Sequence, residues 1–138
     1  MKMEQAQRRY IEYELRHYAG YCQALRDRRE EVLEGSPPPP DGLPRGNRPG
    51  NPTERKALQL IPSTAYIEMD RVVKSIDRAL ASLEERHREI FRIVYVEGKQ
   101  ERYRVCAELH LSYETYNRGK NELIYAAGLE LGVLKSIG

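Results

Sequence analysis

The chain of 138 residues lacks the features that mark membrane, secreted and metal-binding proteins. Its longest nearly apolar run, residues 90–96, is interrupted by Arg92 and is far too short to cross a bilayer. The first residues are polar and hold no signal-peptide core. The two cysteines, Cys22 and Cys106, belong to no CxxC pair or Cys/His cluster, which argues against a disulfide framework and a structural zinc site. We therefore expect a cytoplasmic protein with no cofactor and no membrane partner.

The sequence also lacks a surplus of one charge and a recognisable catalytic motif. Lys and Arg number 23 against 21 Asp and Glu, which gives a formal net charge of +2, whereas nucleic-acid-binding proteins usually carry a clear basic excess. No Gly-rich phosphate loop, nucleophile elbow or paired-carboxylate arrangement stands out, so we expect no enzyme. A case for DNA binding has to come from local pattern.

Proline is concentrated in one short segment. Seven of the eight prolines and four of the ten glycines fall within residues 35–52, where Leu43 is the only aliphatic residue. No core can form there, so the composition predicts a Pro/Gly-rich linker, with Pro37 to Pro40 in polyproline II. A ligand for an SH3-type domain is the alternative interpretation. The linker divides the chain into residues 1–34 and residues 53–138.

Residues 1–34 have a helical period and predict a long amphipathic helix. Its apolar positions recur at steps of four and three, and Arg29 takes the one missing position. The seam consists of Ile11, Leu15, Tyr18, Cys22, Leu25 and Val32. Two interpretations stay open: an arm that packs on the rest of the chain, or a self-association helix that makes a homo-oligomer.

Residues 53–138 predict a second, wholly helical domain. Asn51 can cap a helix that begins at Pro52, and this helix ends or bends before Pro62. Ser63 or Thr64 can start the next one, whose apolar residues again follow a helical period. These apolar residues are Met69, Val72, Val73, Ile76, Ala79, Leu80 and Leu83. No alternating run is bounded by hairpin turns, so the fold class that we expect is all-α.

Residues 83–134 carry the pattern of a helix-turn-helix. A short helix with Ile90, Phe91, Val94 and Tyr95 as its apolar face is expected to stop at Gly98. The motif itself needs an apolar pair four apart, a small contact residue, an apolar residue after the turn and an apolar inner face on its second helix. These roles fall on Val105, Leu109, Cys106, Leu111 and Tyr116.

The turn and the second helix contain two unusual residues. His110 occupies the turn position where Gly is usual, although His enters the left-handed region more often than most residues. Ser112 can cap a second helix that begins at Tyr113 or Glu114. Gly119 inside that helix costs about 1 kcal/mol against Ala, unless it allows a close helix approach.

The histidines do not indicate a metal site. Cys106 and His110 have a spacing that could ligate a metal, but a third ligand is not evident, so we expect none. His17 and His87 lie among charged residues, which predicts that both are solvated.

The exposed face of the second helix holds the candidate DNA contacts. Arg forks onto guanine, Asn onto adenine and Glu accepts from cytosine, so the candidates for base contact are Tyr113, Glu114, Asn117, Arg118 and Asn121. The candidates for phosphate contact are Lys99, Arg102, Arg104 and Lys120. The alternative for each of them is an ordinary solvated position.

The C-terminal segment resembles region four of bacterial sigma factors, which contacts the −35 promoter element. The whole chain is similar to the RinA/ArpU-type late transcriptional regulators of phages. The resemblance rests on YIEYEL at residues 10–15, the Pro/Gly-rich joint, NPTERKA at residues 51–57 and the sigma-like end. It implies a DNA-binding activator of phage late genes that acts with host RNA polymerase in the bacterial cytoplasm, with residues 111–121 as the recognition unit. A phage small terminase subunit and a helical protein-binding adaptor are the alternatives.

The charge by segment limits how the protein would bind DNA. Residues 98–138 hold six basic and five acidic side chains. Few phosphates can then be neutralised by each protomer, and the affinity from counterion release falls with that number. We expect a monomer to bind weakly and to need a second protomer or RNA polymerase.

Overall fold

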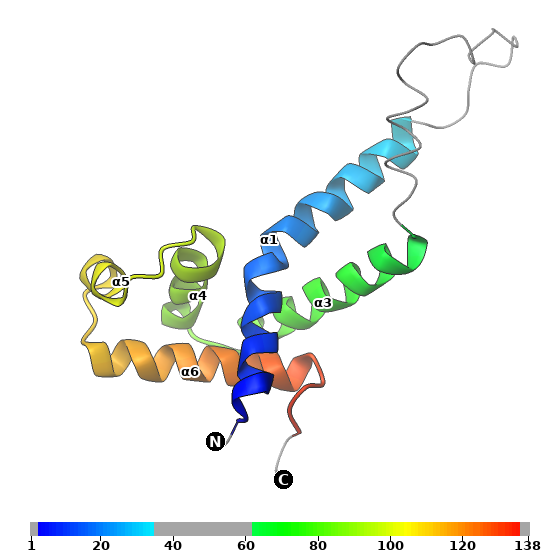
Figure 1. The fold of residues 1–138 in the computed structure, drawn as a ribbon. Coiled ribbons are helices and arrows are strands. Elements are labelled where there is room, and N and C mark those ends of the chain that lie inside the picture. Colours follow the sequence, from blue (N-terminus) through cyan, green and yellow to red (C-terminus); the bar gives the residue numbers. More distant parts are fainter. Residues whose placement is uncertain (1–2, 35–61, 136–138) are drawn as a thin grey trace, which may run out of the picture.

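The structure, a computed structural model, describes residues 3–34 and 62–135. These residues form helices and their connections, with no strand among them, so the predicted all-α fold is confirmed (Figure 1). The elements are α1 (Gln5–Glu34), α3 (Ser63–Ala81), α4 (Glu85–Phe91), the π-helical turn η2 (Arg92–Val96), α5 (Arg102–Leu109) and α6 (Tyr113–Glu130). The predicted linker and the helix expected from Pro52 to Ile61 lie outside the described residues.

Helices α1 and α3 lie side by side and run in opposite directions (Figure 1). The Tyr18 hydroxyl donates to Asp77, and the Arg28 guanidinium lies 4.2 Å from the centre of the Tyr66 ring. A residue in the middle of α1 thus meets a late residue of α3, whereas a late residue of α1 meets an early residue of α3.

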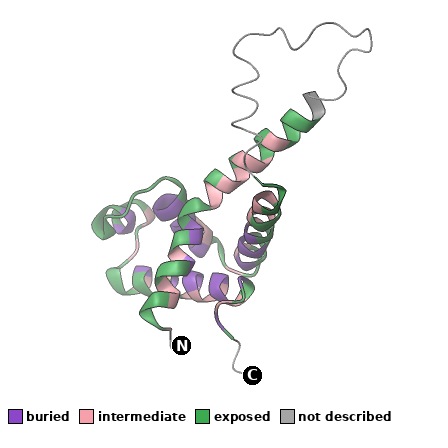
Figure 2. Cartoon of the chain, turned by 45° about the vertical axis from the view of Figure 1, so that its right-hand side comes forward, coloured by how far each residue is buried: buried purple, intermediate pink, exposed green. Residues whose placement is uncertain are grey.

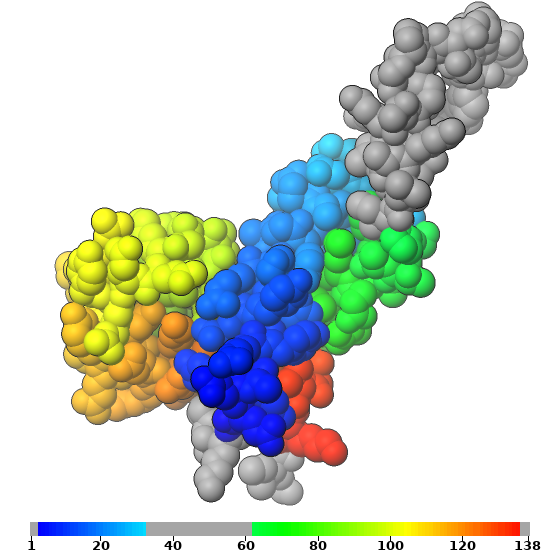
Figure 3. All heavy atoms as spheres, in the orientation of Figure 1, coloured from blue at the N-terminus to red at the C-terminus, as the bar shows by residue number. Residues whose placement is uncertain are grey.

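The first half of α1 belongs to the hydrophobic core. Ile11 and Leu15 are fully buried, in one cluster with Ile76 of α3 and Leu123 of α6. The helix predicted as an arm therefore packs on its own chain, and in Figure 3 it lies between α3 and the part of the molecule formed by α4, α5 and the first part of α6. The far end of the seam is open, because Val32 is 61% exposed. Self-association through α1 stays a prediction.

Two glycines of α6 allow other helices to approach closely. A Cβ at Gly128 would lie 2.5 Å from Ile11 Cδ1 and 2.6 Å from Leu134 Cδ1. A Cβ at Gly119 would lie 2.9 Å from Ile90 Cδ1, so this unusual residue permits the close packing of α4 on α6. Gly128 marks the point where α1 crosses α6.

The helical segment that begins at Glu85 stops at Gly98 as predicted, but it contains a turn that was not predicted. Gly98 has a φ of 79° at the stop. Before it, the Glu97 N–H donates to the Arg92 carbonyl at 2.8 Å, a π-helical bond. In this wide turn Ile93, Val94 and Tyr95 are all buried.

The crossing at Gly128 can be tested by adding one methyl group. We expect Gly128→Ala to lower the free energy of unfolding by about 1–2 kcal/mol, because overpacking a core costs about 1–3 kcal/mol. The control is Gly20→Ala in the exposed part of α1, where nothing lies within 4 Å of the added Cβ. It should raise that free energy by about 0.5–1 kcal/mol through helix propensity. Urea unfolding measures both variants, and equal stabilisation of the two would contradict the crossing.

Candidate nucleic-acid interface

Helices α5 and α6 are joined by a tight turn. His110 has φ 57° and ψ 46°, in the left-handed region, and the Leu111 N–H donates to the Cys106 carbonyl at 2.9 Å. The Ser112 Oγ then accepts the Thr115 N–H at 3.1 Å and caps α6. The left-handed residue, the cap and the helix start at Tyr113 are therefore as predicted.

The inner face of this unit is anchored in the core. The five predicted inward residues all belong to the core or pack against it: Val105, Cys106 and Tyr116 are buried, and Leu109 and Leu111 are partly buried. Burial raises the pKa of the Cys106 thiol and that of the Tyr116 phenol, so both groups remain protonated at neutral pH. These residues hold α6 in a fixed orientation.

The outer face of α6 is polar and open. All five predicted base-contact residues are exposed, and the half of α6 that carries them extends from the α1 crossing toward α5 (Figures 1 and 2). They are Tyr113, Glu114, Asn117, Arg118 and Asn121. The sequence predicted this set as one surface of one helix, and the structure brings it together on that surface.

Most of the candidate basic residues around α6 already face a carboxylate. Arg118 Nη2 lies 3.2 Å from Glu114 Oε1, and Lys99 Nζ lies 3.3 Å from Glu108 Oε1. Arg104 is paired with Glu101 at 2.9 Å. These are surface pairs with largely solvated charges, so they can exchange partners at low cost.

Arg102 and Lys120 have other surroundings. The Arg102 guanidinium lies 4.4 Å from the centre of the Tyr113 ring, and no carboxylate of the described residues pairs with it. The Lys120 side chain is only 25% exposed, with Nζ 3.8 Å from Glu12 Oε1. Burial lowers the pKa of Lys120, an effect that Glu12 opposes. Of the four phosphate candidates, Lys120 is therefore the one held against α1.

Helix α1 supplies residues to this surface that the sequence pattern did not single out. Arg8 Nη1 donates to the Asn121 side-chain oxygen at 2.9 Å, and Arg16 joins Arg8 beside Glu12. The signal was present, since residues 8, 12 and 16 recur every four positions and form one charged stripe on a helix. The pattern did not reveal that this stripe lies against α6.

The prediction that His87 is solvated was wrong. The side chain is buried, its Nδ1 accepts the Glu84 N–H at 3.2 Å, and its Nε2 lies 2.9 Å from Glu122 Oε1. Because Nδ1 accepts, Nε2 carries the hydrogen and donates to Glu122. The charged neighbours in the sequence suggested a solvated side chain, whereas the partner that favours burial, Glu122, comes from α6. His17 is exposed, as predicted.

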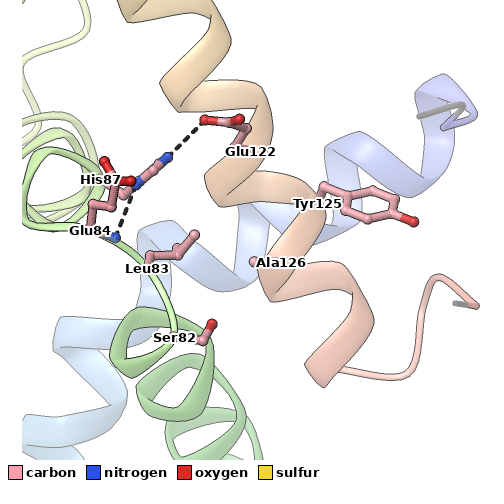
Figure 4. Close-up of a pocket in the computed structure, with 7 residues that line it drawn as sticks. All are labelled: Ser82, Leu83, Glu84, His87, Glu122, Tyr125 and Ala126. Atoms are coloured by element: carbon pink, nitrogen blue, oxygen red, sulfur yellow. Dashed lines mark hydrogen bonds and ion pairs between the residues drawn. The ribbon is translucent and has the colours of Figure 1, made fainter.

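A shallow pocket of about 310 Å³ lies beside this histidine (Figure 4). It is lined by Ser82, Leu83, Glu84, His87, Glu122, Tyr125 and Ala126. In Figure 4 the His87 ring bridges the start of α4 and α6, and the Tyr125 ring points away from it. The histidine thus serves as a link between helices.

The described residues hold neither a metal-ligand cluster nor a membrane-spanning helix. In residues 3–34 and 62–135, no three His, Cys, Asp or Glu side chains come together as ligands for a metal ion. None of the helices in these two ranges is long and apolar enough to cross a membrane.

Comparison of the chain with protein-family models, with curated proteins and with solved structures gives no match. The resemblance to sigma region four and to RinA/ArpU-type regulators therefore rests on the sequence pattern alone. Structural support for a function has to come from the geometry of α5, the turn and α6.

The turn can be tested at His110. We expect the His110→Gly variant to be more stable than the His110→Ala variant by about 1 kcal/mol, because a Cβ in the left-handed region costs about 1–2 kcal/mol. The exposed position makes side-chain packing a minor contribution. Urea unfolding of the two variants provides the comparison, and an alanine variant as stable as the glycine variant would show that the turn does not require this backbone conformation.

Proposed function

We propose that this protein is a sequence-specific, double-stranded DNA-binding regulator of transcription, in which α5, the turn and α6 act as a helix-turn-helix. One observation supports this most strongly. The predicted base-contact side chains all lie on the exposed face of a capped helix whose opposite face is fixed in the core. A helix held in this way can enter a major groove without rearranging the fold.

The outer face of α6 has a chemistry that suits base edges. Arg118 can fork onto guanine, and Asn117 can make two hydrogen bonds to adenine. In the free protein Arg118 is paired with Glu114, and both side chains are largely exposed. Because the pair is at the surface, Arg118 can exchange it for a base contact at little cost in free energy. Glu114 is then free to accept a hydrogen bond from cytosine.

The length of the exposed segment also suits a groove. Tyr113 and Asn121 are eight residues apart, which places them about 12 Å apart along the helix axis. The major groove of B-form DNA is about 12 Å wide, which admits an α-helix. At about 3.4 Å of duplex axis per base pair, the exposed segment can cover about three to four base pairs.

The biological context of the proposal comes from the sequence resemblance. We propose an activator of phage late genes that acts with host RNA polymerase in the bacterial cytoplasm and is encoded by a phage or prophage. The near-neutral charge of residues 98–138 agrees with a protein that needs a second protomer or polymerase to bind firmly.

Selection of bound duplexes from a random library tests the proposal. We expect one sequence to be enriched. Asn117→Ala and Arg118→Ala should each weaken binding to it by about 1–3 kcal/mol, which is roughly 5- to 150-fold, because each variant cannot make a bidentate base contact. Arg29→Ala is the matched control, since this exposed arginine lies near the far end of α1.

The outcomes separate DNA binding from base contact by α6. The control should bind with parental affinity, and added RNA polymerase should tighten the complex. No enriched sequence would reject DNA recognition and favour the protein-binding adaptor. Unchanged affinity and sequence preference in both α6 variants would reject α6 as the recognition helix.

A further inference from the structure

Glu12 of α1 is surrounded by positively charged side chains. Arg8 Nε and Arg16 Nη2 each lie 3.9 Å from a Glu12 oxygen, and Lys120 Nζ of α6 lies 3.8 Å from Oε1. The same Oε1 accepts the hydroxyl hydrogen of buried Tyr95 at 2.8 Å. Glu12 itself is 15% exposed, so it lies beneath the three cations.

This cluster differs from the other charged groups near α6. Arg118, Lys99 and Arg104 each face at least one carboxylate. Around Glu12, three cations share one carboxylate, which leaves two positive charges in excess. Among the described residues, Arg102 and this cluster are therefore the two places next to α6 where the nearly neutral chain has a local positive surplus.

The cations of the cluster can accept a further anion. Their distances to Glu12 are longer than those of direct hydrogen bonds. Arg8 and Arg16 are 36% and 45% exposed, and a guanidinium has five N–H donors. Burial lowers the pKa of Lys120, and the nearby Arg8 and Arg16 lower it further. An anion would relieve this mutual repulsion.

The position of the cluster indicates which anion it binds. Arg8 donates to Asn121, the last of the candidate base-contact residues. At the other end of the exposed segment, Arg102 lies over the Tyr113 ring. The two cationic groups thus flank the exposed segment at its two ends, about 12 Å apart along the helix axis, where phosphates that border a groove entered by α6 would lie.

We propose that Arg8 and Arg16 of α1, together with Lys120 of α6, form a site for the phosphates of the DNA backbone, with Glu12 as the residue that positions them. This inference rests on the proposed function and extends it, because it makes the N-terminal helix part of the DNA-binding surface. The phosphates border the groove that α6 enters, and the contact is independent of base sequence.

Salt dependence measures the proposed contacts directly. The experiment uses the full chain and a 25-base-pair duplex of arbitrary sequence, because phosphate contacts do not depend on sequence. The logarithm of the association constant falls with the logarithm of salt concentration by about 0.9 for each phosphate contact. We expect the Arg8→Gln/Arg16→Gln double variant to reduce this slope by about 1.8, because it neutralises about two fewer phosphates than the parent protein.

Two further variants separate a site from a general loss of charge. Arg26→Gln/Arg29→Gln removes the same charge from exposed positions of α1 that lie about 15–30 Å along the helix from the cluster, beyond the Debye length of about 8 Å at physiological salt. Its slope should equal that of the parent protein. Arg8→Lys/Arg16→Lys keeps the charges and should retain most of the slope, which excludes misfolding as the cause of a reduced slope.

Each outcome has one meaning. A reduction confined to the Arg8→Gln/Arg16→Gln variant supports the site. Equal reductions in both glutamine variants would show a net-charge effect and overturn it. An unchanged slope in the Arg8→Gln/Arg16→Gln variant, in a protein that binds duplex DNA, would overturn the site and leave the proposed function standing. A parent protein that binds neither this duplex nor any sequence from the random library, with or without RNA polymerase, would overturn the proposed function as well.

Discussion

The crossing of α1 over α6 at Gly128 is the constraint on which the rest of the structure depends. Because this residue has no side chain, Ile11 can pack directly on α6, and Leu15 follows it into the core. The same crossing sets the position of the charged stripe, about two turns from Gly128 along α6, with Arg8 against Asn121 and Glu12 against Lys120. A single close approach thus links the stability of the fold to the composition of the candidate DNA-binding surface.

The fold gives a nearly neutral sequence an uneven charge distribution. Most cations around α5 and α6 are balanced by carboxylates nearby, such as Glu114 beside Arg118 and Glu101 beside Arg104. The surplus is placed at the two ends of the exposed segment, at Arg102 and at the cluster around Glu12. The net charge of +2 is therefore a poor description of the candidate DNA-binding surface. Surface charge depends on which side chains the fold brings together.

Features determined by local sequence could be predicted, whereas features determined by distant partners could not. The start of α6, the cap at Ser112 and the left-handed His110 follow from a few adjacent residues, and all were predicted. The burial of His87 depends on Glu122, which is 35 positions away, and the bond between Arg8 and Asn121 spans 113 positions. The residues of the candidate base-contact surface were therefore predicted, but the share that α1 contributes to it was not.

The proposed DNA-binding surface combines the first half of α6 with the Arg8–Arg16 face of α1. It is tested most directly by a two-dimensional ¹H–¹⁵N NMR titration of the protein with a short DNA duplex. The amide signals of residues 113–121 and of residues 8–16 are predicted to shift together, with one apparent affinity, while those of residues 20–30 and 82–84 stay unchanged. Shifts confined to other parts of the molecule, or no shifts at all, would contradict the account.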